Sequence, residues 1–214
     1  MLCKLELIRS VVCIGAHADD IEIGCGGTLL SLRQANPQIR IDWIVLAGDE
    51  SRRTEAELSF RNWTENSPDC HLHQFDFPDT LFPWRGVAIK AAIHRIAETL
   101  CPDIVFSHFK FDAHQDHRLV SELAWNAFRN HLILEYEIPK YEGDLGNPNV
   151  FFPLSDSVAK RKVELLMQCF PSQREKPWFD ERTFYALLRL RGIESKAADG
   201  WAEAFHGRKI LLTV

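Results

Sequence analysis

The chain has 214 residues, of which 46% are hydrophobic, and a formal net charge of -5 at pH 7. This length and composition are typical of one large domain, so we expect a single domain over residues 1–214. The mild acidity, without a run of Lys or Arg, argues against a nucleic-acid partner. The longest apolar runs have the length of strands and the amino terminus lacks a secretory signal pattern, so we expect a cytoplasmic protein without a membrane span.

The cysteines are scattered and include no C-x-x-C pair. They are Cys3, Cys13, Cys25, Cys70, Cys101 and Cys169. A disulfide framework is unusual in a chain of this length, and the spacing used by structural zinc sites is missing. We therefore expect reduced cysteines, several of which sit in apolar stretches and act as small apolar residues.

The first predicted strand covers residues 11–14 and ends at Gly15, where the backbone can turn sharply. His17, Asp19 and Asp20 follow directly. In an open parallel sheet, ligands bind in the crevice beyond the carboxyl ends of the strands. These three ionisable side chains are therefore placed for chemistry rather than for packing.

A glycine-rich stretch follows the first cluster and leads into a helical pattern. Gly24, Gly26 and Gly27 read G-x-G-G, and the helical pattern covers residues 29–35 before Pro37 ends it. The spacing and the late start of this run match a nucleotide-binding loop poorly. We interpret the glycines as sites of close packing between a helix and the sheet.

Alternating strands and helices continue along the chain. The predicted strands are residues 41–47, 71–77 and 104–107, and the predicted helices are residues 52–66, 87–100 and 115–130. This alternation predicts an α/β fold with a doubly wound parallel sheet and helices on both faces. Beyond residue 130, we predict short strands at 133–138, 150–153 and 209–214 and helices at 156–170 and 180–192. We interpret this last part as an elaboration of the same sheet.

A second cluster of ionisable residues follows the predicted strand at residues 104–107. Its members are His108, Asp112, His114, Asp116 and His117. His17 and Asp20 can converge on one metal ion, and a histidine of the second cluster completes three ligands, leaving Asp19 beside the metal. A carboxylate next to metal-activated water is what a hydrolase requires. The remaining histidines are isolated, and we interpret them as ordinary polar residues: His71, His73, His94, His131 and His206.

Two motifs of the sequence belong to a known pattern. The segment A-H-A-D-D-I-E-I-G-C-G-G-T at residues 16–28 resembles the A-H-P-D-D-x-x-x-G-x-G-G signature of the PIG-L/LmbE-type de-N-acetylases. The segment A-H-Q-D-H at residues 113–117 resembles their H-x-D-H motif. Supporting pieces follow in the family's order, so that the similarity covers nearly the whole chain. They lie at residues 48–55, 77–79, 136–139, 172–173 and 201–205.

The resemblance implies a Rossmann-like, mostly parallel fold and zinc-dependent removal of acetyl from an N-acetylglucosamine-type conjugate by attack of a zinc-bound water. Asp19 would be the general base. His114 would stabilise the oxyanion and protonate the departing amine, and Asp116 would orient His114. The implied Zn²⁺ ligands are His17, Asp20 and His117.

The resemblance also indicates candidate sugar-binding residues, and this sequence differs from the family pattern at one position. Arg52, Arg53 and Asp79 are the candidate substrate-binding residues. Ala18 stands where the family usually has proline, which fixes φ and restrains the residue before it. No ligand is lost with this change, so we expect activity to survive.

Other interpretations remain open at the level of sequence. One is a metal-dependent hydrolase of another bond, such as a phosphoester, and another is a non-catalytic sugar- or nucleotide-binding protein. The same ligands accept Zn²⁺ and Fe²⁺. The sequence leaves open the sugar conjugate and whether the chain forms a homo-oligomer. Trp84 and Trp178 have aromatic faces that can stack on a sugar or pack against the protein.

Overall fold

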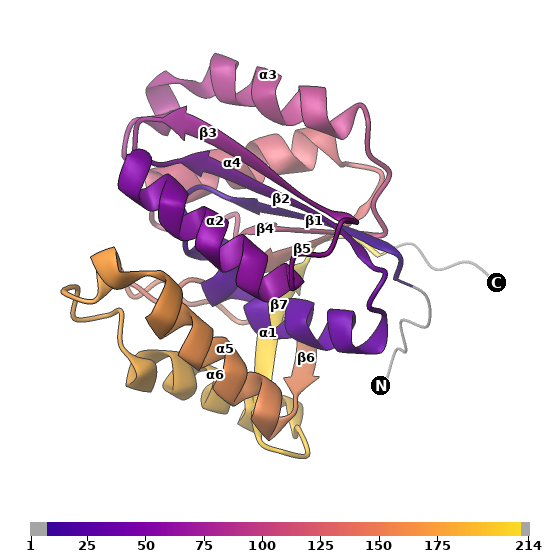
Figure 1. Cartoon of the computed structure of the whole chain (residues 1–214), viewed down its shortest axis with the longest axis vertical. Coiled ribbons are helices and arrows are strands. Elements are labelled where there is room, and N and C mark those ends of the chain that lie inside the picture. Colours follow the sequence, from indigo (N-terminus) through magenta and orange to yellow (C-terminus); the bar gives the residue numbers. More distant parts are fainter. Residues whose placement is uncertain (1–7, 211–214) are drawn as a thin grey trace.

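A computed structural model describes residues 8–210 of the chain (Figure 1). Its centre is a seven-stranded sheet with the order β3-β2-β1-β4-β5-β7-β6. Strands β1 to β5 pair in parallel, and β7 runs antiparallel to both of its neighbours. The strands are β1 (Ser10–Gly15), β2 (Arg40–Ala47), β3 (Cys70–Phe77), β4 (Ile104–His108), β5 (Leu132–Tyr136), β6 (Val150–Leu154) and β7 (Trp201–Gly207).

Helices cover both faces of this sheet, as Figure 1 shows. Successive side chains of a strand point to opposite faces, so Val12 belongs to the core on the side of α3 and α4, while Val11 belongs to the core on the side of α1, α2, α5 and α6. The helices are α1 (Asp20–Ala35), α2 (Glu50–Thr64), α3 (Gly86–Ala97), α4 (Gln115–Ala127), α5 (Asp156–Cys169) and α6 (Glu181–Ser195), with short turns η1 (Phe82–Trp84) and η2 (Pro171–Gln173). The predicted doubly wound, mostly parallel α/β fold is confirmed.

The order of the strands brings the two ionisable clusters together. The chain runs outward from β1 to β2 and β3, then returns to place β4 on the other side of β1. Residue Val11 of β1 lies opposite Ile104 of β4, so these strands end side by side. The carboxyl ends of strands at such a reversal form the crevice in which open α/β sheets bind ligands.

Helix α1 begins at Asp20, earlier than the sequence pattern indicated, and includes the glycines. A Cβ atom on Gly24 would lie 2.2 Å from Cδ2 of Tyr136, and one on Gly26 would lie 2.9 Å from Nε1 of Trp63. Glycine therefore lets α1 approach β5 and α2 closely. The interpretation of these residues as packing positions agrees with the structure, whereas the helix boundary predicted at residue 29 was wrong.

The last predicted strand differs from the structure. Residues 209–210 are not in a strand, and the rest of the predicted strand at 209–214 lies outside the described residues. Strand β7 lies earlier in the chain and contains Glu203, a carboxylate that is atypical of a central strand. Glu203 is buried because Lys162 of α5 pairs with it at 2.5 Å and backbone N–H groups of α1 donate to it. These partners lie far from Glu203 in the sequence. The charged residue therefore made the segment look unlike a strand when only its local sequence was considered.

Two further expectations concern the cysteines and the membrane. The five cysteines within residues 8–210 are free, and four of them are buried, while Cys101 is exposed and Cys3 lies outside the described part of the chain. None of the helices between residues 8 and 210 has the length and apolar character needed to span a membrane.

The contact between Gly24 and Tyr136 generates a prediction about stability. The variant Gly24→Ala should lower the free energy of unfolding by about 1–3 kcal/mol, because the added methyl group overpacks a buried contact. Gly86→Ala is the matched control, since a Cβ atom there would meet only Leu119 at 3.8 Å. Urea unfolding of both variants measures the difference, and equal stabilities would contradict the packing role of Gly24.

Candidate active site

An open cleft of about 1290 Å³ lies at the carboxyl ends of the parallel strands. Its lining includes members of both ionisable clusters. The turn from β1 into α1 contributes His17, Asp19 and Asp20, the first residue of α1, and the start of α4 contributes His114 at its N-cap and His117 in its first turn. The structure therefore brings together the two segments that the sequence separates by about a hundred residues.

Local structure fixes the two segments in place. The backbone N–H of His17 donates to Oδ2 of Asp20 at 2.6 Å, and Ala16 accepts from the N–H of Ala47 at 2.8 Å. Asp19 occupies the N-cap position of α1, but its side chain makes no capping bond and remains available to the cleft. His114 caps α4, because its Nδ1 accepts from the N–H of Asp116 at 3.3 Å. A neutral His114 therefore carries its proton on Nε2.

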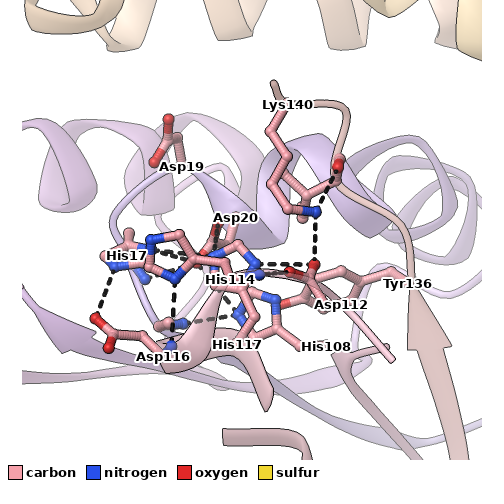
Figure 2. A network of polar contacts seen from close by, with 12 residues as sticks. His17, Asp19, Asp20, His108, Asp112, His114, Asp116, His117, Tyr136 and Lys140 are labelled. Atoms are coloured by element: carbon pink, nitrogen blue, oxygen red, sulfur yellow. Dashed lines mark hydrogen bonds and ion pairs between the residues drawn. The ribbon is translucent and has the colours of Figure 1, made fainter. Parts of the chain in front are cut away.

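The donor atoms of His17, Asp20 and His117 converge (Figure 2). Nδ1 of His17 lies 3.2 Å from Nε2 of His117 and 3.3 Å from Oδ2 of Asp20. Oδ1 of Asp20 lies 3.5 Å from Nε2 of His117. In a tetrahedral site with metal–ligand bonds of about 2.0–2.1 Å, neighbouring ligand atoms lie about 3.3 Å apart. The three side chains therefore stand at the spacing of ligands around one tetrahedral metal ion, with Asp20 presenting Oδ2 to His17 and Oδ1 to His117.

Carboxylates face the outer nitrogens of both imidazoles. Nδ1 of His117 and Oδ2 of Asp112 are hydrogen-bonded at 3.0 Å. Nε2 of His17 lies 2.8 Å from Oδ1 of Asp79 and 3.4 Å from Oδ2 of Asp116. A carboxylate on the outer nitrogen holds the proton there and leaves the inner nitrogen free to bind a metal. The surroundings of both rings thus match those of metal-binding histidines.

The charges of the cluster are strongly coupled. Burial and the neighbouring His108 lower the pKa of His117 to about 3, so its imidazole is neutral at pH 7. Burial alone would raise the pKa of Asp20, but His117 and His108 hold it well below its usual range. Burial opposes protonation of His17, yet the carboxylates of Asp20 and Asp116 raise its pKa well above the usual value. A metal ion at this point would compete with a proton for His17.

Asp19 has a different environment from Asp20. It stands apart from the imidazole cluster in Figure 2, and Arg52 donates from Nη2 to its Oδ1 at 2.5 Å. Burial raises the pKa of Asp19, and the guanidinium of Arg52 opposes that rise. Arg52 also donates to Oε2 of Glu55 at 2.6 Å, and Glu55 accepts from the N–H of Ser172 at 2.8 Å. Arg52, expected at the sugar, is therefore engaged with two protein carboxylates.

The other predicted site residues have varied surroundings. Arg53 is exposed and lines the cleft, and the side chain of Asp79 is 66% exposed despite its approach to His17. We expected the carboxylate of Asp116 to orient His114, but it has other partners. It accepts from the N–H groups of Thr80 and Phe82 at 2.8 and 3.2 Å and faces His17. The first turn of α4 directs this side chain toward the loop after β3.

The two tryptophans noted in the sequence lie in different places. Trp178 lines the cleft, whereas Trp84 lies in η1 with 71% of its surface exposed.

Two more residues are part of the site: His108, a member of the second cluster without an assigned role, and Lys140, which the sequence did not single out. Nε2 of His108 accepts from the N–H of Ala16 at 2.9 Å, and the ring stacks on His117 with centroids 3.9 Å apart. Its position at the end of β4 was the available signal. Lys140 donates to Asp112 at 3.0 Å. Nothing in the sequence around this lysine indicated the contact.

The sequence profile of the PIG-L family, described as GlcNAc-PI de-N-acetylase, matches residues 12–128, which is more than half of the chain. The chain belongs to the PIG-L family. The matched region contains both clusters, and the resemblance drawn from the two motifs is confirmed. This PIG-L protein is also 30% identical over 150 residues to the uncharacterized deacetylase YaiS of Escherichia coli K12. The alignment covers 65% of this chain and 79% of YaiS.

Solved structures show the same fold. The N,N'-diacetylchitobiose deacetylase from Pyrococcus horikoshii is 20% identical, with a TM-score of 0.71 covering 94% of this chain and 84% of that one. GalB, the 4-carboxy-2-hydroxymuconate hydratase from Pseudomonas putida KT2440, is 19% identical, with a TM-score of 0.70 covering 97% and 99%. Deacetylases and a hydratase share this fold, so the fold of this PIG-L protein does not define its reaction. The reaction has to be inferred from the residues of the site.

Proposed function

We propose that this protein is a zinc-dependent de-N-acetylase that hydrolyses the acetamide of an N-acetylated amino sugar. The observation that carries the proposal is the convergence of His17, Asp20 and His117 within 3.2–3.5 Å in a cleft that Asp19 and His114 also line. Membership of a deacetylase family and the likeness to a diacetylchitobiose deacetylase favour this bond and this class of substrate. Fe²⁺ suits the same ligands.

His17, Asp20 and His117 would hold the metal. When bound there, the ion lowers the pKa of water and polarises the amide carbonyl. Asp112 on the outer side of His117, and Asp79 and Asp116 on the outer side of His17, keep the two rings directed at the metal position.

Asp19 would act as the general base. Arg52 fixes one of its oxygens, so the other can take a proton from the attacking water at a constant position. The Nε2–H of His114 would stabilise the oxyanion by a hydrogen bond. The proton that Asp19 takes from the water would then protonate the nitrogen as the C–N bond breaks, so His114 stays neutral. The products are acetate and a free amine. Arg53 and Asp79 are the proposed sugar contacts.

Acetate release tests the proposed reaction. The zinc-loaded protein should release acetate and an equimolar primary amine from at least one N-acetylglucosaminide in a panel of free, nucleotide-linked and lipid-linked sugars. EDTA should abolish the release and added Zn²⁺ should restore it, because the ion supplies the activated water. Release that survives chelation, or none from any substrate, would refute the zinc-dependent reaction.

The roles of neighbouring residues can be separated by metal analysis. His17→Ala should lose bound zinc, whereas Asp19→Ala should retain it and lose about 10²–10⁴-fold in kcat, the usual contribution of a general base. His71→Ala, at an exposed histidine of β3, is the matched control and should keep both metal and activity. Equal loss of metal in the His17 and Asp19 variants would contradict the assignment.

The two arginines should differ in their kinetic effect. Arg52→Lys keeps the charge but loses the fork that joins Asp19 to Glu55, so kcat should fall about 10-fold or more with little change in KM. Arg53→Met should mainly raise KM, because this exposed side chain has no comparable tie to the base. Steady-state kinetics on a substrate identified by the acetate-release panel measure kcat and KM for both variants. A raised KM in Arg52→Lys with a lowered kcat in Arg53→Met would contradict these roles.

A further inference from the structure

Lys140 is a largely buried cation in the segment 139–149, which lies in the connection between β5 and β6. Its side chain is 9% exposed. Nζ donates to Oδ2 of Asp112 at 3.0 Å, to both oxygens of Asp144 at 2.7 Å, and to the carbonyl of Ile138 at 3.3 Å. An ammonium group has three protons, and protein acceptors engage all of them. Although Lys140 lines the cleft, it has no proton left for a substrate.

Asp112 connects this lysine to the proposed metal site. The carboxylate oxygen that receives Lys140 also faces Nδ1 of His117 at 3.0 Å, and Figure 2 shows Lys140 reaching across to Asp112 above the histidines. The other oxygen accepts from the N–H of His114 at 2.7 Å. Asp112 is 2% exposed, so these contacts are its main compensation for burial.

A second contact holds the same two segments together. Oδ2 of Asp144 accepts from the N–H of Ala113 at 2.5 Å. The segment 139–149 is therefore tied to the loop before α4 through both members of the Lys140–Asp144 pair. Without the lysine, the carboxylates of Asp112 and Asp144 would face each other without a cation between them, and like charges in a buried place repel strongly.

We propose that Lys140 is a positioning residue that couples metal binding at His117 to the seating of segment 139–149 at the rim of the cleft. The inference rests on the proposed function, in which His117 is a metal ligand. Lys140 holds Asp112, and Asp112 holds the imidazole of His117 in the tautomer and orientation that a metal needs. Because coupling between two equilibria is reciprocal, bound metal in turn stabilises the rim segment.

Two measurements on Lys140→Met test this coupling. Competition with a chromophoric chelator gives the Zn²⁺ affinity, which should fall about 10-fold, the lower end of the usual effect for partners of metal ligands. Amide hydrogen exchange with and without Zn²⁺ reports on residues 139–149. Zinc should slow exchange there in the wild-type protein and should have little effect in the variant. Lys140→Arg, which keeps the charge, should recover part of both effects.

Arg40→Met is the matched control. It removes a cation from another buried carboxylate, Asp42, which Arg40 contacts at 2.7 Å at the amino end of β2, away from the cleft. Its Zn²⁺ affinity should stay within about 2-fold of wild type, because no partner of a metal ligand is affected. If Lys140→Met fails to fold, the double variant Lys140→Met/Asp144→Asn keeps the net charge of the cluster and is expected to show the same loss of coupling.

The outcomes separate this inference from the function on which it rests. Wild-type zinc binding with unchanged affinity in Lys140→Met would overturn the coupling and leave the metal site standing. An equal loss of affinity in Arg40→Met would overturn it as well, since general destabilisation would then explain the effect. A wild-type protein that binds no Zn²⁺ would overturn the metal site and the coupling together.

Discussion

Two imidazoles that face one point, each with a carboxylate on its outer nitrogen, impose the main constraint on this structure. Under the proposed function each ring binds a metal through its inner nitrogen, and a carboxylate on the other side keeps the proton of a neutral ring on the outer nitrogen. Asp112 faces the outer nitrogen of His117, and Asp79 and Asp116 face the outer nitrogen of His17. The loops around the cleft must therefore hold these acids as accurately as the rings themselves.

The same acids also hold the loops. Asp116 accepts from two backbone N–H groups at Thr80 and Phe82, so the turn after β3 is fixed to the first turn of α4. Asp112 does the same for the start of α4 through the N–H of His114. Burying several charges is costly unless each is paired and hydrogen-bonded. In this protein the bonds that satisfy the acids are also those that shape the cleft, so the site and its surrounding loops form one unit.

The sequence predicted the parts of this arrangement that depend on periodicity and strand order. Apolar runs before His17 and before the second cluster indicated strand ends, and a parallel sheet brings such ends together. The sequence did not reveal contacts fixed by tertiary packing. It indicated that Gly24 is a packing position but not that Tyr136 is its partner, and the low helix propensity of glycine concealed that α1 begins before it. Lys140 comes from a connection without periodicity, so its contact with Asp112 depends on the folded chain alone.

Asp19 and Asp20 show how position rather than residue type assigns chemistry. Asp20 lies against His117 and His108, which keep its pKa well below the usual range, whereas burial raises the pKa of Asp19. Neighbouring side chains at the start of a helix point in different directions, so one enters the imidazole cluster and the other faces Arg52. Under the proposed function, the first becomes a permanently charged ligand and the second a proton acceptor. Two adjacent, identical residues thus acquire the separate properties that hydrolysis of an amide requires.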